Sequence, residues 1–284
     1  MEHTSAQFAA ADGLLLTRQE WRSKSEPAAV LAVVHGYGEH GGRYRGLAED
    51  MVPRGCDVHV YDLRGHGLSG GRRGHLGCFA DYLDDTAVFL KAVREEQPGR
   101  PVYLLGHSLG GLIAAAYVED RPGDAPAGLI LSSPFLRLGM PVPPLKLHAA
   151  RLLSLVAPAV NIGNTLDPAE LSHDQDVVSA YRIDPLNHHV ATARWAAEVV
   201  AAQSAALSAA HRIRLPLLLL YADADAVADP QACRDLFERA ASPDKTVHCY
   251  EGFYHEIFND TGRDAVFADL ATWLEARAPA GGAD

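Results

Sequence analysis

Residues 106–110, Gly-His-Ser-Leu-Gly, form a Gly-x-Ser-x-Gly motif between an apolar run and a helical pattern. A strand before the serine and a helix after it are the context in which this motif presents a nucleophile, because the glycines allow a tight turn. A serine hydroxyl attacks a carbonyl carbon only when a base removes its proton. The motif therefore predicts Ser108 as a nucleophile. The alternative is a Gly/Ser turn without chemistry.

A base and an acid for this serine are expected further along the chain. His255, in FYHEIF, follows the last strand pattern and precedes the last helical pattern, which predicts a general base and then a general acid. Before it, residues 217–230 (LLLLYADADAVADP) run from an apolar strand pattern into Asp223, Asp225 and Asp229. Asp229 precedes Pro230 and a helical pattern, so it is predicted to cap that helix, with a secondary place near His255 as the alternative. Asp223 is predicted to bond local loop backbone.

A second glycine-rich loop, residues 35–44 (HGYGEHGGRY), also follows an early strand pattern. Acyl transfer needs two N–H donors for the oxyanion of the tetrahedral intermediate, and the sequence predicts the amides of Leu109 and Tyr37. A surface turn is the alternative, whereas a phosphate loop is excluded because no GxxxxGK[ST] is present. The residues expected to contact substrate around these donors are His35, Gly36, Glu39, Arg43 and His107. Glu39 and Arg43 would either pair beside the leaving group or form a solvated helix start.

Several longer stretches carry a resemblance to a known family. The chain resembles the α/β-hydrolase fold and, within it, the monoacylglycerol lipase and lysophospholipase group. The matching stretches are HGYGEHGGRY (35–44), DLRGHGLSGGRRGH (62–75), GHSLGG (106–111), LSSPFL (131–136), YRIDPL (181–186) and FYH (253–255). The resemblance implies a serine hydrolase that acts on small lipid esters without a cofactor.

The resemblance also separates the three aspartates. The family pattern is a strand followed by Gly-x-x-Asp, which places Ala222 where the family usually has glycine and Asp225 at the acid position. The implied triad is therefore Ser108, Asp225 and His255, in which the aspartate orients the imidazole. The DLRGHGLSGGRRGH stretch (62–75) is interpreted as scaffold beneath the site, with direct substrate contact by Arg72 or Arg73 as the alternative.

The elements that must position these residues are short apolar runs that alternate with helical patterns. Strands are predicted at 29–36, 57–65, 101–108, 127–134, 215–222 and 245–252, and helices at 43–54, 79–97, 109–120, 230–241 and 264–277. Residues in GLLLTRQEWRS could add antiparallel strands at the edge. Most runs are apolar on both faces, which is typical of a mainly parallel sheet covered by helices, an α/β architecture.

One segment interrupts this alternation, because residues 135–212 contain no convincing buried strand. We therefore predict a hydrolase core at 1–134 and 213–284, with a helical cap or lid at 135–212 inserted after the strand at 127–134. The cap stretch 140–163 carries Leu145, Leu147, Leu152, Leu153, Leu155 and Val156 with few charges. These side chains would either line an acyl-chain tunnel and touch a membrane surface transiently, or pack the cap onto the core.

Composition excludes other classes of function. The formal net charge of −11 makes nucleic acid an unexpected partner, since phosphate binding needs a basic surface. The four cysteines form no CxxC pair and the histidines no HExxH, so no metal site is expected. No run of about 18 apolar residues and no secretory signal pattern is present, which favours a cytoplasmic protein, peripheral to a membrane at most. The sequence gives no indication of oligomeric state.

The predicted triad fits more than one substrate. A monoacylglycerol is the leading expectation, and a lysophospholipid, a simple carboxylic ester, a thioester or a peptide amide would use the same groups. A non-catalytic ligand-binding protein on a hydrolase scaffold is the alternative outside enzymes. Epoxide hydrolase or dehalogenase chemistry is disfavoured because those enzymes of this fold use an aspartate where this chain has Ser108.

Overall fold

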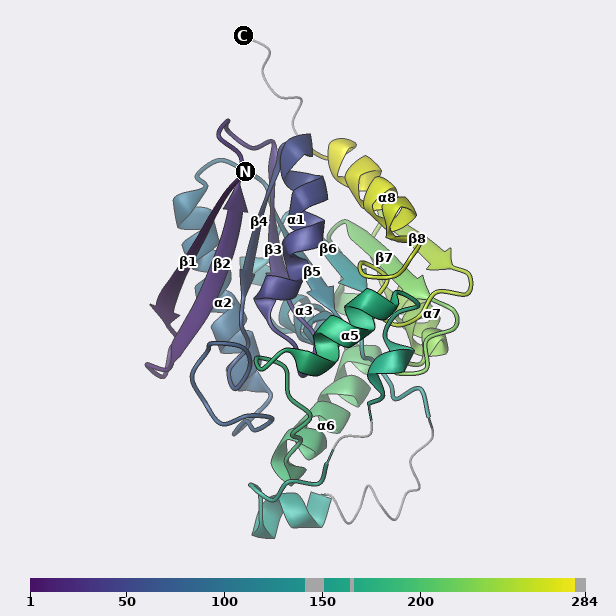
Figure 1. Cartoon of the computed structure of the whole chain (residues 1–284). Helices are drawn as coiled ribbons and strands as arrows, with labels where there is room; N and C mark the ends of the chain where they lie inside the picture. The colour runs from purple at the N-terminus through teal and green to yellow at the C-terminus, as the bar shows by residue number, and fades with distance from the viewer. Residues whose placement is uncertain (141–150, 164–165, 279–284) are drawn as a thin grey trace.

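An eight-stranded sheet forms the centre of the molecule (Figure 1). The computed structural model describes residues 1–140, 151–163 and 166–278. The strand order is β1-β2-β4-β3-β5-β6-β7-β8, in which β2 is antiparallel to β1 and β4 and every pair from β4 to β8 is parallel. The strands are β1 (Glu2–Ala9), β2 (Leu15–Arg22), β3 (Ala29–Val34), β4 (Cys56–Tyr61), β5 (Val102–His107), β6 (Gly128–Ser132), β7 (Leu217–Ala222) and β8 (Lys245–Tyr250).

Helices cover both faces of this sheet. On one face lie α1 (Arg45–Met51) and α8 (Arg263–Glu275), and on the other lie α2 (Ala80–Glu96), α3 (Leu109–Asp120) and α7 (Pro230–Arg239) (Figure 1). Because successive side chains of a strand point to opposite faces, β3 sends Val30, Ala32 and Val34 into one core and Leu31 and Val33 into the other. This double burial explains why the central strands are apolar at nearly every position and confirms the predicted α/β sheet.

Between β6 and β7 the chain leaves the sheet. Its described residues form α5 (Gln175–Ile183) and α6 (Ala193–Ala209), and residues 151–156 are also helical. α6 packs against α3, next to the serine turn. The segment is helical as expected, while its division from the core at 134/135 and 212/213 stays a prediction. Leu145 and Leu147 of the predicted tunnel lie outside the described residues.

Short 3-10 helices join several of these elements. They are η1 (Gly41–Tyr44), η2 (Val52–Arg54), η3 (Pro122–Asp124), η4 (Pro168–Glu170) and η5 (Ala210–Arg212). The predicted helix at 43–54 is therefore wrong in its limits, since only its middle is α-helical. The predicted strands are also a few residues too long, because the sequence does not mark the point where each strand turns into a site loop. No helix in the described ranges is long and apolar enough to cross a membrane.

Candidate active site

Ser108 lies in the turn between β5 and α3, at the carboxyl end of the sheet. Its backbone has φ 53° and ψ −118°, a strained conformation for a residue with a side chain. The flanking glycines make the turn possible. A Cβ on Gly106 would lie 2.2 Å from the carbonyl oxygen of Gly110, and one on Gly110 would lie 2.0 Å from that of Val34. The strained turn therefore lifts the Ser108 hydroxyl away from the sheet.

Three side chains from separate loops form one hydrogen-bonded chain. The Ser108 hydroxyl lies 2.8 Å from Nε2 of His255, and Nδ1 of His255 lies 2.7 Å from Oδ2 of Asp225. Only 4% of the His255 side chain and 3% of the Asp225 side chain are exposed. Because the Asp225 carboxylate accepts a hydrogen bond from Nδ1–H, the imidazole keeps its proton on Nδ1, and Nε2 is left free to accept one from the hydroxyl. The arrangement can therefore move a proton off the serine.

The protonation of His255 reflects two opposing effects. Burial is the largest single effect and lowers the pKa of the imidazole, but the Asp225 carboxylate, with Glu256 and Glu39, raises it by more in total and leaves the pKa above its ordinary value of 6.5. The neighbouring imidazole of His107 behaves differently, since burial and the proximity of His255 lower its pKa to about 4. His255 is thus the histidine of this pair that can take up a proton near neutral pH.

The three aspartates after β7 have separate contacts. Oδ1 of Asp225 accepts hydrogen bonds from the amides of Val227 and Ala228, which fixes the carboxylate toward His255. Asp229 caps α7, because its side chain accepts from the amide of Gln231. The prediction for Asp223 is wrong in its partner. Its carboxylate accepts from the amide of Gly252, across the sheet edge in the loop after β8, rather than from its own loop.

Two backbone amides are the predicted donors for an oxyanion beside Ser108. In the loop after β3 the Gly36 amide is already used, since it donates to Oε1 of Glu39 at 2.6 Å. The amides of Tyr37 and Leu109 donate no hydrogen bond within the part of the chain that the structure describes. They therefore stay the predicted oxyanion donors.

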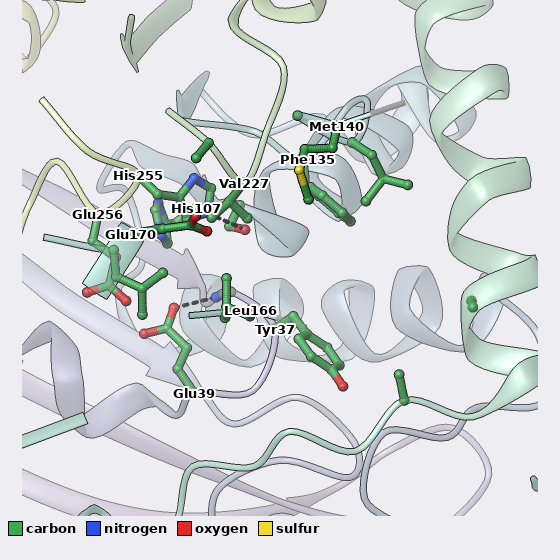
Figure 2. Close-up of a pocket in the computed structure, with 18 of the residues that line it drawn as sticks. Tyr37, Glu39, His107, Phe135, Met140, Leu166, Glu170, Val227, His255 and Glu256 are labelled. Atoms are coloured by element: carbon green, nitrogen blue, oxygen red, sulfur yellow. Dashed lines mark hydrogen bonds between the residues drawn. The ribbon is translucent and has the colours of Figure 1, made fainter. Parts of the chain in front are cut away.

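A cavity of about 430 Å³ opens above Ser108 and His255. Its polar side chains gather at one side, where Figure 2 shows Glu39, His107, Glu170, His255 and Glu256, whereas Phe135 and Met140 lie at the other. The remaining apolar lining includes Leu138, Ile162, Leu166, Leu171, Trp195 and Val227. A cavity whose lining is both polar and apolar suits a molecule of the same mixed character.

Known proteins share this arrangement of elements. The Hydrolase_4 family, described as serine aminopeptidase, S33, matches residues 25–262. The chain belongs to this family. It is 33% identical to a monoacylglycerol lipase of Mycolicibacterium smegmatis over 94% of this chain and 95% of the relative, and 34% identical to a monoglyceride lipase of Homo sapiens over 96% and 90%. The solved monoacylglycerol lipase of Paleococcus ferrophilus superposes with a TM-score of 0.80 at 33% identity, covering 98% of this chain and all of that one.

Not every residue expected to contact substrate lines the cavity of this hydrolase. Gly36, Glu39 and His107 do, but His35 and Arg43 are not among its described lining residues. His35 is fully buried beneath the loop, where its Nε2 accepts from the amide of Leu63. Arg43 points between two carboxylates instead of into the cavity. The solvated helix start proposed as an alternative for Glu39 and Arg43 is also wrong, because both side chains are largely buried.

Arg72 and Arg73 of the stretch at 62–75 support the loops. Arg72 donates to the carbonyl of Ala159 and Arg73 to that of Gly67, and neither is among the described lining residues. Asp62 of the same stretch accepts from the amides of Gly41 and Leu68, which ties two loops together. The scaffold interpretation agrees with these contacts.

Several lining residues were not identified from the sequence. Tyr181 and Trp195 come from α5 and α6, and Phe135 follows β6. Phe135 and Tyr181 lie within the matching stretches LSSPFL and YRIDPL, which is the one signal that pointed to them. Glu256 had a stronger signal that was overlooked, since it directly follows His255.

No metal site was expected from the sequence, but one group of two glutamates and a histidine lies close enough together to be considered as one. Glu20 on β2, His59 on β4 and Glu96 at the end of α2 place ligand atoms within 4.8 Å of one another. Arg18 pairs with both carboxylates there, so a guanidinium already supplies the positive charge. Burial is the largest effect that lowers the pKa of His59, and the positive charges of Arg22 and Arg18 lower it further. This donor set is poorly suited to a divalent cation.

Proposed function

We propose that this protein is a serine hydrolase that cleaves the ester of a monoacylglycerol through an acyl-enzyme intermediate. The observation that carries the proposal is the hydrogen-bonded chain from Asp225 through His255 to Ser108 at the base of the cavity. The relatives named above as monoacylglycerol and monoglyceride lipases support the choice of substrate. The cavity, with its carboxylates at one side and apolar residues at the other, supports it independently.

The first half of the reaction forms the acyl-enzyme. Oγ of Ser108 attacks the ester carbonyl carbon while its proton passes to Nε2 of His255. The carbonyl oxygen becomes negatively charged and accepts hydrogen bonds from the amides of Tyr37 and Leu109. The carbon–oxygen bond to glycerol then breaks, and the proton on His255 passes to the departing glycerol oxygen.

The second half repeats the steps with water. A water molecule loses a proton to His255 and attacks the acyl carbon, and the same amides stabilise the second oxyanion. The bond to Ser108 breaks, the serine recovers the proton and the fatty acid leaves. Asp225 keeps its negative charge throughout and stabilises the imidazolium of His255.

The charge of the cavity favours a neutral leaving group. Glu39, Glu170 and Glu256 line it, and no lysine or arginine is among its described lining residues. Burial is the largest single effect on the Glu39 carboxyl and raises its pKa, but Arg43, the neighbouring histidines His107 and His35 and the Gly36 amide together lower that pKa to about 2. Glu39 is therefore ionised. Arg43 bridges Glu39 and Glu256 and offsets only one negative charge, so an anionic headgroup would still meet like charges, whereas glycerol hydroxyls can donate to carboxylate oxygens.

This charge argument predicts the order of substrates. When both substrates carry the same acyl chain, kcat/KM is expected to be at least about 10-fold lower for lysophosphatidate than for monoacylglycerol. This ratio corresponds to a difference of about 1.4 kcal/mol in activation free energy. Released fatty acid measures both rates. A p-nitrophenyl ester and an anilide with that acyl chain form the control pair, and the ester should be the faster. Equal or faster turnover of lysophosphatidate would contradict the neutral-headgroup proposal, and faster turnover of the anilide would favour an amidase.

A second prediction concerns pH. His255 must be neutral to accept the serine proton, and its raised pKa means that protonation begins above the ordinary imidazole range. kcat/KM for a p-nitrophenyl ester should therefore be full at alkaline pH and fall as pH drops, with its midpoint above 6.5. His107, with a pKa of about 4, should add no second step near neutrality. A midpoint below 6.5 would mean that burial outweighs the carboxylates around His255 and would contradict this prediction.

Transient contact with a lipid surface is part of the proposal. Leu152, Leu155 and Val156 lie in the helical stretch 151–156 and are 63%, 71% and 73% exposed. Met140, which lines the cavity, is 69% exposed. Apolar side chains exposed to water can enter a membrane interface, and Met140 would connect such an interface to the cavity.

A further inference from the structure

Glu256 is the first residue of a buried polar chain that the reaction scheme does not use. Its carboxylate accepts two hydrogen bonds from the guanidinium of Arg43, at 2.6 Å and 2.7 Å. The same guanidinium donates to Oε2 of Glu39 at 2.9 Å. The Glu39 and Glu256 residues are each 4% exposed. One arginine therefore bridges two buried carboxylates from distant parts of the sequence.

The Glu39 end of this chain lies under the predicted oxyanion loop. Oε1 of Glu39 accepts from the Gly36 amide at 2.6 Å and from the Tyr44 hydroxyl at 3.0 Å. Gly36 is bonded to Tyr37, whose amide is the predicted oxyanion donor. The fit is close, because a Cβ on Gly36 would lie 2.9 Å from Oε1 of Glu39 and 3.2 Å from Cβ of Ser108. A shift of Glu39 would therefore shift the Gly36–Tyr37 peptide relative to Ser108.

The Glu256 end lies in the loop that carries His255. Glu256 directly follows the histidine, its amide donates to the carbonyl of Leu171, and its carboxylate also accepts from Asn259. Figure 2 shows the side chains of Glu39 and Glu256 on the same side of the cavity. The polar chain thus connects the loop of the proposed base to the loop of the predicted oxyanion donor.

Geometry makes this connection stiff. A guanidinium is planar and offers its donors in a fixed fork, so bidentate pairing sets both the distance and the angle between its partners. The three charged groups are buried, and an unpaired carboxylate in a buried position costs free energy. The ion pairs between these side chains are therefore expected to persist. A displacement of about 1 Å at a reacting group can cost about 100-fold in rate.

We propose that Glu256 is a positioning residue that acts through Arg43 and Glu39 to hold the Tyr37 amide in line with Ser108 and His255. The inference rests on the proposed function, because it assigns a role within that reaction. This positioning role differs from a role in folding alone. It requires that substitution of Glu256 weaken stabilisation of the oxyanion more than it weakens substrate binding.

The test compares Glu256→Gln with a matched control, Asp85→Asn. Asp85 also accepts two hydrogen bonds from one arginine, Arg64, each at 2.7 Å, but on α2 rather than in an active-site loop. Rates are measured on the alkaline plateau, because Glu256 also raises the pKa of His255. An alkyl trifluoromethyl ketone, which forms a tetrahedral adduct with a serine, reports oxyanion binding through its Ki.

In Glu256→Gln, kcat/KM is expected to fall about 10- to 100-fold and the ketone Ki to rise by the same factor, with KM within about 3-fold. Asp85→Asn should lower the melting temperature and leave both quantities unchanged. Arg43→Lys keeps the charge but lacks the fork, so it should reproduce the loss and serves as the test if Glu256→Gln does not fold. A folded Glu256→Gln or Arg43→Lys with unchanged kcat/KM and Ki would overturn the proposal. Inactive wild-type protein would instead overturn the proposed function.

Discussion

Replacement of Ser108 by alanine is expected to lower kcat for monoacylglycerol hydrolysis by about 10⁵- to 10⁶-fold, the size of loss seen when a serine nucleophile is removed. The hydroxyl that His255 deprotonates is then absent, so no acyl-enzyme can form and only oxyanion binding remains. Substrate binding should change little, because the cavity lining is otherwise intact. Release of fatty acid, with enzyme concentration raised to reach the slow variant, measures the loss.

Ser133→Ala is the matched control for this substitution. Ser133 is another buried serine with a positive φ, 39°, and its hydroxyl has no hydrogen-bond partner among the described residues. Removal of this hydroxyl should leave kcat within about 3-fold of the wild-type value, because a group without a hydrogen-bond partner contributes little to a reaction in which it takes no part. A Ser108→Ala enzyme that kept a tenth or more of the activity would exclude Ser108 as the nucleophile.

Asp225→Asn should produce the second largest effect, about 10⁴-fold in kcat. The amide can donate to Nδ1 of His255 and so favours the tautomer whose Nε2 carries a proton, which cannot accept the serine proton. It also removes the negative charge that stabilises the imidazolium. The two amides of Val227 and Ala228 would still hold the side chain in place, so folding should be preserved. Steady-state kinetics together with a melting curve separates the two effects.

The neighbouring aspartates are internal controls. Asp229→Ala should cost about 1 kcal/mol of unfolding free energy, because it removes the cap of α7, with kcat nearly unchanged. Asp223→Asn should weaken one contact to the Gly252 amide and leave kcat within about 10-fold. If Asp223→Asn or Asp229→Asn were the crippling change instead, the acid would be assigned wrongly while the nucleophile and base would stand.

The serine turn is the part of the molecule that local sequence determines most completely. Gly106 and Gly110 are required because carbonyl oxygens lie about where their side chains would be, and the helix predicted at 109–120 coincides with α3. The central strands could be predicted equally well from the sequence, since burial on both faces requires continuous apolar runs. The Asp229 cap followed from a short motif of capping aspartate and proline.

Other features depend on contacts between distant segments, which one sequence does not reveal. The β1 strand is exposed along most of its length and pairs only with β2, so it lacks the apolar pattern of a buried strand. Arg43 was expected to contact substrate, but its guanidinium instead donates to Glu256, which lies 213 positions away in the sequence. The partner of Asp223 lies 29 positions away, across the sheet edge. In each case the tertiary partner, rather than local preference, decides the outcome.

The most direct test of the central claim is covalent labelling with a fluorophosphonate, followed by peptide mapping. Such a probe reacts with a serine that a neighbouring base activates, so the proposal predicts one phosphonyl group per chain on the peptide that contains Ser108. Labelling should abolish monoacylglycerol hydrolysis in proportion to its extent and should be absent in Ser108→Ala. A folded wild-type protein that hydrolyses monoacylglycerol but stays unlabelled, or carries the label on another residue, would contradict the account.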